Sequence, residues 1–153
     1  MTARLNPYTI SPQVLQPLHD FSQAVIKMGL EPSLISLVEI RASQLNGCAI
    51  CLHMHTRDAR KAGETEERIY LLDSWRETPL YSPRERAALA WTEALTRLSE
   101  THAPDADYEL LKAEFAEEEQ LKLTMMINVI NSWNRLGVGF RASPPVSAGR
   151  AAA

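Results

Sequence analysis

Hydrophobic residues recur at helical spacing along most of the chain. In residues 14–28 apolar side chains return every three or four positions until Gly29, and a second run of this kind covers residues 32–46 and stops at Gly47. Such spacing is typical of amphipathic helices that bury one face. No segment shows the alternation of apolar and polar residues that indicates a half-buried strand. We therefore predict an all-α fold.

Five further segments carry helical signals. Ser82, Pro83 and Glu85 have the order of a capping box with proline at the first helical position, so a helix is expected to begin there. The last segment is apolar almost all round, which is typical of a helix at the centre of a bundle or in a subunit interface. The five predicted helices cover residues 48–61, 66–76, 83–98, 108–116 and 120–140.

The length of the chain fits one domain. At 153 residues it can bury a core of its own, so we expect a single helical bundle of six or seven helices over residues 1–142. Residues 143–153 lack periodicity and have little to bury, which predicts a disordered C-terminal tail. The apolar last helix and the three tryptophans favour a homo-oligomer, either a dimer, a trimer or a hexamer.

The charge balance narrows the class of partner. The net charge is -3 at pH 7, and the chain has no block of lysine or arginine, so neither nucleic acid nor an anionic membrane surface is a predicted partner. No run reaches the roughly 18 apolar residues of a membrane span, and the first residues lack the apolar core of a secretory signal. We expect a soluble, cytoplasmic protein whose partners are small molecules or proteins.

The candidate chemistry gathers in residues 46–55, which hold both cysteines and two of the four histidines. At about 100° per residue, Cys48, Cys51 and His55 fall within about 60° of one another on a helix, whereas His53 lies on nearly the opposite face. Two cysteines three residues apart can close as a disulfide with little backbone movement. Because Cys48 is expected in the first turn, the helix N-terminus favours a thiolate there.

The residues alone leave several uses of this face open. The helix dipole favours Cys48 as the more ionised sulfur, whereas His55 could activate Cys51, so the order of the two cysteines is undecided. A zinc site would lack a fourth ligand unless His53 turned toward the cysteines. Two inert, buried cysteines are another alternative, whereas Leu52 directly after the pair excludes haem attachment by its spacing. We predict no metal and no cofactor.

Residues 39–51, continued by residues 53–59, carry a pattern that closely resembles a known family. The letters EIRASQLNGCAIC and then HMHTRDA are similar to the core of the alkylhydroperoxidase D (AhpD-like) group, within the carboxymuconolactone decarboxylase superfamily. Residues 82–93 and 131–135 resemble the same group. The resemblance therefore covers roughly residues 14–141 and is most specific at the cysteine pair.

This resemblance implies an oligomeric all-α peroxidase with a peroxiredoxin-like thiol cycle on hydrogen or organic peroxides. The cysteine that peroxide oxidises to a sulfenic acid in that group matches Cys51. Its first cysteine matches Cys48, which would donate a proton, resolve the sulfenic acid as a Cys48–Cys51 disulfide and exchange with the thiols of an external dithiol reductant protein. The histidine of its proton relay matches His55.

One position departs from the family pattern. The relay glutamate of the group stands twelve residues before the first cysteine, and this chain has Ser36 there. Glu39 follows three residues later, close to one helical turn, so it keeps roughly the same face and is the possible relay acid. The alternative for Glu39 is a surface ion pair with Arg41 or with a neighbouring subunit.

Two other functions stay open beside the peroxidase. The lactone decarboxylase branch of the superfamily is a different enzyme class, and its members do not depend on a cysteine pair. The same scaffold could also serve as a non-catalytic thiol redox sensor or a zinc-binding module. The presence of both cysteines together with His55 favours redox chemistry over the decarboxylase.

Overall fold

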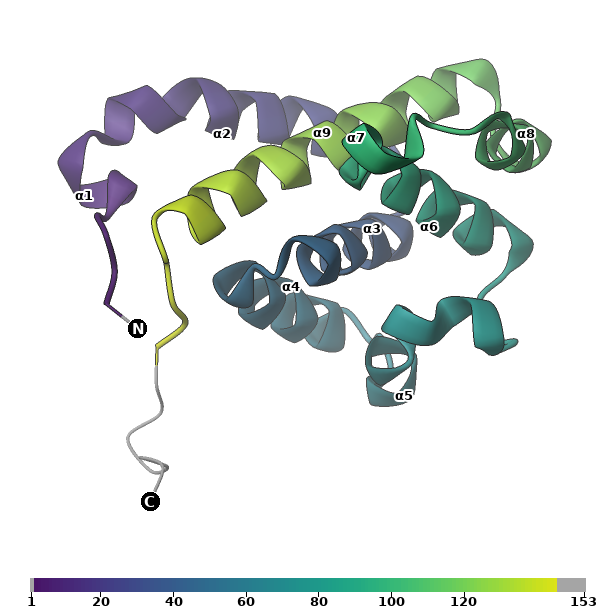
Figure 1. The fold of residues 1–153 in the computed structure, drawn as a ribbon, viewed down its shortest axis with the longest axis horizontal. Helices are drawn as coiled ribbons and strands as arrows, with labels where there is room; N and C mark the ends of the chain where they lie inside the picture. The colour runs from purple at the N-terminus through teal and green to yellow at the C-terminus, as the bar shows by residue number, and fades with distance from the viewer. Residues whose placement is uncertain (1, 146–153) are drawn as a thin grey trace.

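The computed structural model describes residues 2–145, and in that range the secondary structure is entirely helical, which confirms the predicted class (Figure 1). From residue 146 onward the predicted tail lies outside the described residues. In chain order the elements are α1 (Pro7–Ile10), α2 (Pro12–Ile26), α3 (Pro32–Asn46), α4 (Ala49–Lys61), α5 (Glu66–Tyr70), the 3-10 helix η1 (Leu72–Glu77), α6 (Pro83–Thr96), α7 (Leu98–Thr101), α8 (Asp105–Glu114) and α9 (Glu117–Gly139).

Helix α3 is central, because it packs against α4, α6 and α9. Its Leu37, Val38 and Ile40 side chains are fully buried. Val38 belongs to a core cluster shared with α2, α6, α8 and α9, whereas Leu37 and Ile40 belong to a second cluster shared with α4, α5, η1 and α6. Burying apolar surface on both sides fixes α3 in the bundle, and so fixes the turn that follows it.

The predicted start of α6 is confirmed. Ser82 Oγ accepts a hydrogen bond from Glu85 N at 3.2 Å, and Ser82 N donates to the Glu85 carboxylate at 2.8 Å. These two bonds satisfy backbone donors that a helix start leaves without intrahelical partners.

Several helix boundaries differ from the prediction. Residues 66–76 form α5 and η1 rather than one helix. Helix α5 ends at its C-cap residue Leu71 (φ -88°, ψ 1°), and the tighter η1, itself kinked at Ser74 (φ -110°, ψ 29°), brings Leu72 and Trp75 onto the second core cluster. The helix predicted to reach Leu98 ends at Thr96, and the Leu98 side chain is 52% exposed. The short helix α1 was not predicted.

The N-terminal segment lies beside the C-terminal end of α9 (Figure 1). Arg4 N donates to Phe140 O at 3.0 Å, and the Arg4 guanidinium donates to Gly139 O at 3.1 Å. The last carbonyls of a helix have no intrahelical donor and carry partial negative charge, so a cation there is stabilising. These bonds hold α1 close to α9.

Candidate functional site

The turn between α3 and α4 sets the position of the cysteines. Gly47 has a left-handed backbone (φ 65°) that ends α3, a conformation that glycine adopts at little cost. Cys48 N then donates to Ser43 O at 3.0 Å. Cys48 is the N-cap residue of α4, one position before the first turn in which it was expected.

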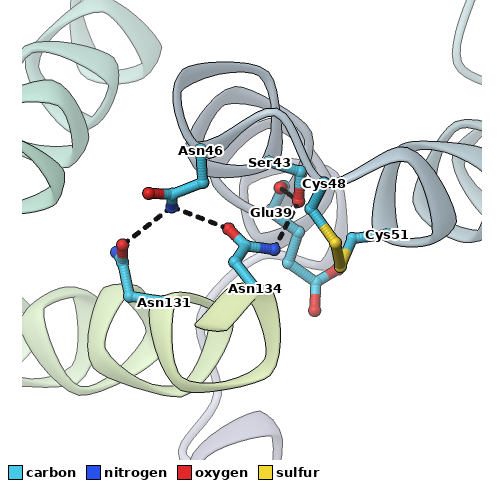
Figure 2. The surroundings of a disulfide bond; sticks show 7 residues. All are labelled: Glu39, Ser43, Asn46, Cys48, Cys51, Asn131 and Asn134. Carbon is cyan, nitrogen blue, oxygen red and sulfur yellow. Dashed lines mark hydrogen bonds between the residues drawn. A yellow bond between two sulfur atoms is a disulfide. The ribbon is translucent and has the colours of Figure 1, made fainter. Parts of the chain in front are cut away.

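The Sγ atoms of Cys48 and Cys51 are joined in a disulfide, with 5.3 Å between the two Cα atoms (Figure 2). Both residues are nearly inaccessible, since Cys48 is 1% exposed and Cys51 is 6% exposed. The first turn of α4, counted from its N-cap residue, therefore brings the two sulfurs together.

His55 lies one turn after Cys51 and is paired with Glu39. The His55 Nδ1 and Glu39 Oε2 atoms are 3.0 Å apart, and the two side chains are 19% and 17% exposed. Arg41, the alternative partner for Glu39, instead binds Glu93 on another part of the molecule. A carboxylate that holds one imidazole nitrogen leaves the other free to accept or deliver a proton.

Ser36 stands where the resemblance would have a relay glutamate. Its hydroxyl donates to Pro32 O of its own helix at 3.1 Å, and it does not line the cavity beside the disulfide. Glu39, one turn further along α3, does line that cavity. Of the two positions, Glu39 is therefore the one that brings a carboxylate to the cavity.

A cavity of about 220 Å³ opens beside the disulfide. Cys51, Glu39 and His55 line it, whereas Cys48 does not. The other lining residues come from α1, α2, α4, α9 and the segment after α9, and most of them are apolar or aromatic: Pro7, Tyr8, His19, Ile50, Met54, Val129, Trp133, Leu136, Gly137 and Ala142.

Tyr8 and His19 were missed as site residues by the sequence analysis. The Tyr8 ring stacks on the Trp133 ring with 6.4 Å between centroids, and the His19 ring is tilted against it at 4.8 Å. Trp133 is itself fixed by a hydrogen bond from its indole nitrogen to Ser22 Oγ at 2.8 Å. Partial burial raises the pKa of the Tyr8 hydroxyl above its ordinary value. Only the packing of α1 and α2 on α9 reveals these residues.

Helix α9 approaches the disulfide closely at Gly137. A β-carbon on this residue would lie 2.7 Å from Cys48 Sγ and 3.4 Å from Cys51 Sγ, the first of which is well inside van der Waals contact. Only glycine allows the backbone of α9 to cover the sulfur of Cys48 at this distance. Nothing in the sequence pattern distinguished Gly137 from Gly139.

Four polar side chains connect α9 to the end of α3 (Figure 2). Asn46 Nδ2 donates to Asn131 Oδ1 and to Asn134 Oδ1, both at 2.9 Å. Asn134 Nδ2 donates to Ser43 Oγ at 3.0 Å, and Ser43 Oγ donates to Glu39 O at 2.7 Å. A satisfied buried network of this kind rigidifies what it joins, here the turn that carries Cys48.

A family model described as the carboxymuconolactone decarboxylase family matches residues 12–94. The chain belongs to this family. It is 41% identical over 138 residues to the uncharacterized protein YdfG of Bacillus subtilis (strain 168), a match that covers 90% of this chain and 94% of that protein.

Solved structures place this family member in the AhpD-like fold. A protein of unknown function from Agrobacterium tumefaciens, described as a candidate antioxidant defence protein AhpD, matches with a TM-score of 0.93 at 42% identity over 95% of this chain and 100% of that one. An uncharacterized peroxidase-related protein from Silicibacter sp. TM1040 matches with a TM-score of 0.76 at 20% identity, over 90% of this chain and 73% of that one. The second likeness concerns the fold alone.

The remaining expectations for this family member concern metals and membranes. Among residues 2–145, no three His, Cys, Asp or Glu side chains cluster so as to hold a metal ion. His53, the additional ligand considered for zinc, lies 3.3 Å from the Arg57 guanidinium through its Nε2 atom. Within the same residues, none of the helices has the length and apolar character needed to cross a membrane.

Proposed function

We propose that this protein is a thiol-dependent peroxidase that reduces hydrogen peroxide or organic hydroperoxides through Cys51 and Cys48. One observation carries the proposal. The sulfur-bearing residue Cys51, which is bonded to Cys48, lines the same cavity as the His55–Glu39 pair. A nucleophile, a base and a carboxylate that orients the base are the parts that thiol activation requires.

The first step starts from the reduced cysteines. The Cys51 thiol gives its proton to His55, which Glu39 orients, and the resulting thiolate attacks the terminal oxygen of the peroxide. The O–O bond breaks, the sulfur becomes a sulfenic acid, and the departing oxygen takes a proton from His55. The released product is water from hydrogen peroxide, or an alcohol from an organic hydroperoxide.

The second step uses the other cysteine. The Cys48 thiol condenses with the Cys51 sulfenic acid, which forms the S–S bond and releases water. An external protein with two thiols then reduces this disulfide and becomes oxidised itself. No cofactor enters this cycle, because the electrons come from the dithiol.

The comparisons support the redox branch of the family over the decarboxylase branch. The similar Agrobacterium structure, at 42% identity, is described as a candidate antioxidant defence protein. The lactone decarboxylases of the superfamily do not depend on a cysteine pair. This chain has such a pair beside a histidine and a carboxylate.

The proposal is tested by peroxide consumption in the presence of dithiothreitol. We expect the wild type to consume peroxide and the reduced protein to lose two hydrogens, seen by intact mass, after one equivalent. Cys51→Ser should be inactive, and Cys48→Ser should accumulate a sulfenic acid that dimedone labels. His53→Asn is the matched control on the outer face of α4 and should behave as the wild type. Unchanged turnover in Cys51→Ser contradicts the proposal.

Two further results would indicate a thiol sensor or a lactone decarboxylase instead of a peroxidase. Oxidation of the pair by peroxide without repeated turnover indicates a thiol sensor rather than an enzyme. Conversion of a lactone by a protein with both cysteines replaced by serine indicates the decarboxylase.

We also propose self-association, favoured by apolar residues exposed on α9 such as Leu121 (68%) and Val138 (45%). Light scattering after gel filtration should then give at least twice the monomer mass.

A further inference from the structure

The two sulfurs of the disulfide have different surroundings. Cys51 lines the cavity, whose wall also includes exposed residues such as Tyr8 (53%) and Met54 (50%), so the cavity is open to solvent. Cys48 is 1% exposed and does not line this cavity. A molecule that enters from solvent therefore meets the sulfur of Cys51 first.

Helix α9 lies against both sulfurs and approaches Cys48 more closely. A β-carbon at Gly137 would lie 2.7 Å from Cys48 Sγ and 3.4 Å from Cys51 Sγ. No thiol can approach Cys48 from this direction without moving α9.

The backbone of Cys48 is also held at both ends. Cys48 N donates to Ser43 O at 3.0 Å, and Cys48 O accepts from Leu52 N at 2.9 Å. The Ser43 hydroxyl accepts in turn from Asn134 of α9 at 3.0 Å (Figure 2). An outward rotation of Cys48 would break these buried hydrogen bonds, each of which is unfavourable to leave unmade.

We propose that the thiol that reduces the disulfide attacks the sulfur of Cys51 from within the cavity, and that Cys48 is the leaving sulfur. This order of attack would serve to regenerate the reduced cysteines of the proposed peroxidase cycle, and in that respect it rests on the proposed function. It gives Cys51 the exchange function that the family resemblance assigns to Cys48. Which sulfur is attacked depends on access and on the stability of the departing thiolate, and both favour this order.

The stability of the departing thiolate follows from the position of Cys48. It is the N-cap residue of α4, a helix of 13 residues, where unpaired backbone N–H groups and the positive end of the helix dipole lower the pKa of a thiol. A thiol of lower pKa leaves faster in disulfide exchange. The His55–Glu39 pair on the cavity side can take the proton of the entering thiol.

The exchange transfers two electrons from the reductant to the Cys48–Cys51 disulfide in two steps. The first thiol of the reductant loses its proton, forms a bond to Cys51 Sγ and displaces Cys48 as a thiolate, which takes up a proton. The second thiol of the reductant then attacks the reductant sulfur of this mixed disulfide and releases Cys51. The reductant ends as a disulfide, and both cysteines end as thiols. Peroxide and reductant thus use one cavity of about 220 Å³ in turn.

The test uses the wild-type protein oxidised with diamide, so that no peroxide is involved. The disulfide is mixed with 2-mercaptoethanol, quenched within seconds with N-ethylmaleimide, and the peptide is fragmented between Ala49 and Ile50. We expect mercaptoethanol on Cys51 and maleimide on Cys48 in at least tenfold excess over the opposite arrangement. Equal amounts, or the opposite excess, overturn the proposal.

A second measurement avoids exchange between the two cysteines. Cys48→Ser and Cys51→Ser are each converted to a mixed disulfide with thionitrobenzoate, and its release by 2-mercaptoethanol is followed by absorbance. Release from Cys51 should be at least tenfold faster than release from Cys48. Adding Met54→Trp at the cavity wall should slow release from Cys51 several-fold and leave release from Cys48 unchanged, whereas Met28→Trp, away from the cavity, should slow neither.

Failure of this proposal differs from failure of the proposed function. An unchanged release rate from Cys51 in the Met54→Trp variant, or faster release from Cys48, contradicts entry through the cavity and leaves peroxide reduction intact. A protein whose cysteines ignore peroxide but exchange with thiols in the expected order contradicts the peroxidase and supports the order of attack.

Discussion

Two charged groups on helix α3, Glu39 and Arg41, are only two residues apart and serve opposite purposes. The Arg41 side chain is 8% exposed and donates to Glu93, Asp73 and Gln44. The Glu39 carboxylate has one ionisable partner, His55, and otherwise faces the cavity. The Arg41 guanidinium is held by three side chains of the protein, whereas the Glu39 carboxylate keeps one side open to the cavity.

The Glu93 carboxylate, which accepts from Arg41, is likewise held by several donors; Arg41, Glu93, Trp75 and Arg76 together form the Arg41 cluster. Glu93 Oε1 accepts from Arg41 and from the Trp75 indole, each at 2.8 Å, and Glu93 Oε2 accepts from Arg76. These contacts join α3, η1 and α6, so the cluster holds the bundle together but offers no group for a reaction. A partly buried charge becomes available for chemistry only where the fold leaves one of its sides unpaired.

Removing Arg41 should have the largest effect on stability. Arg41→Met leaves the Glu93 carboxylate without its most buried charged partner, and breaking such a pair destabilises a protein by about 3 kcal/mol. Denaturant unfolding of the oxidised protein measures this change. Arg60→Ala removes an exposed pair with Glu66 and should change stability by less than about 1 kcal/mol. Equal losses of stability in the two variants would contradict the claim that the buried Arg41–Glu93 pair contributes more than an exposed ion pair.

Removing the charge of Glu39 should affect the reaction rather than the fold. Glu39→Gln keeps the shape of the side chain but leaves His55 without an anionic partner, so we expect the rate of Cys51 oxidation to fall about 100-fold. Stopped-flow measurement of peroxide reduction gives this rate. Adding Ser36→Glu should restore nothing, because Ser36 does not line the cavity. Recovery of activity in that double variant would place the relay acid at the earlier position.

Gly137 and Gly139 offer a matched pair on one helix. In Gly137→Ala the new methyl group meets Cys48 Sγ, and overpacking of this kind destabilises a protein by about 2 kcal/mol. In Gly139→Ala the methyl group has no atom within 4 Å, so stability should stay the same or rise by about 0.5 kcal/mol. Thermal unfolding of both variants tests the close approach of α9, and equal melting temperatures would argue against it.

Local patterns in the sequence accounted for much of the fold. The capping box at Ser82 and the glycine that ends α3 act through neighbours within a few residues, so the chain order reveals them. The split of residues 66–76 depends on the burial of Leu72 and Trp75 against helices distant in sequence. Propensity within one segment cannot report such contacts.

The residues of the candidate site likewise fall into those set by local sequence and those set by contacts between distant helices. Cys51 and His55 lie one turn apart on α4, and Cys48 is the N-cap residue of the same helix, so these positions follow from local geometry. Tyr8 and His19 reach the cavity only because α1 and α2 pack on α9 around Trp133. A position of this kind follows from tertiary packing, which no periodicity in a single sequence encodes.

Lowering the pH should reduce the contribution of Glu93 to the free energy of unfolding, and this effect should be smaller than the effects of the substitutions above. Burial alone would raise the pKa of the Glu93 carboxyl, but hydrogen bonds from Trp75, Arg76 and Arg41 outweigh it and hold the pKa below the ordinary 4.5. The unfolded state therefore binds more protons, and this stabilisation, complete above pH 4.5, is lost as the pH falls through the lower folded value. Denaturant unfolding between pH 3 and about pH 6 should show the wild type losing its advantage over Glu93→Gln. A constant difference between the two proteins would mean that Glu93 is not held in its charged form.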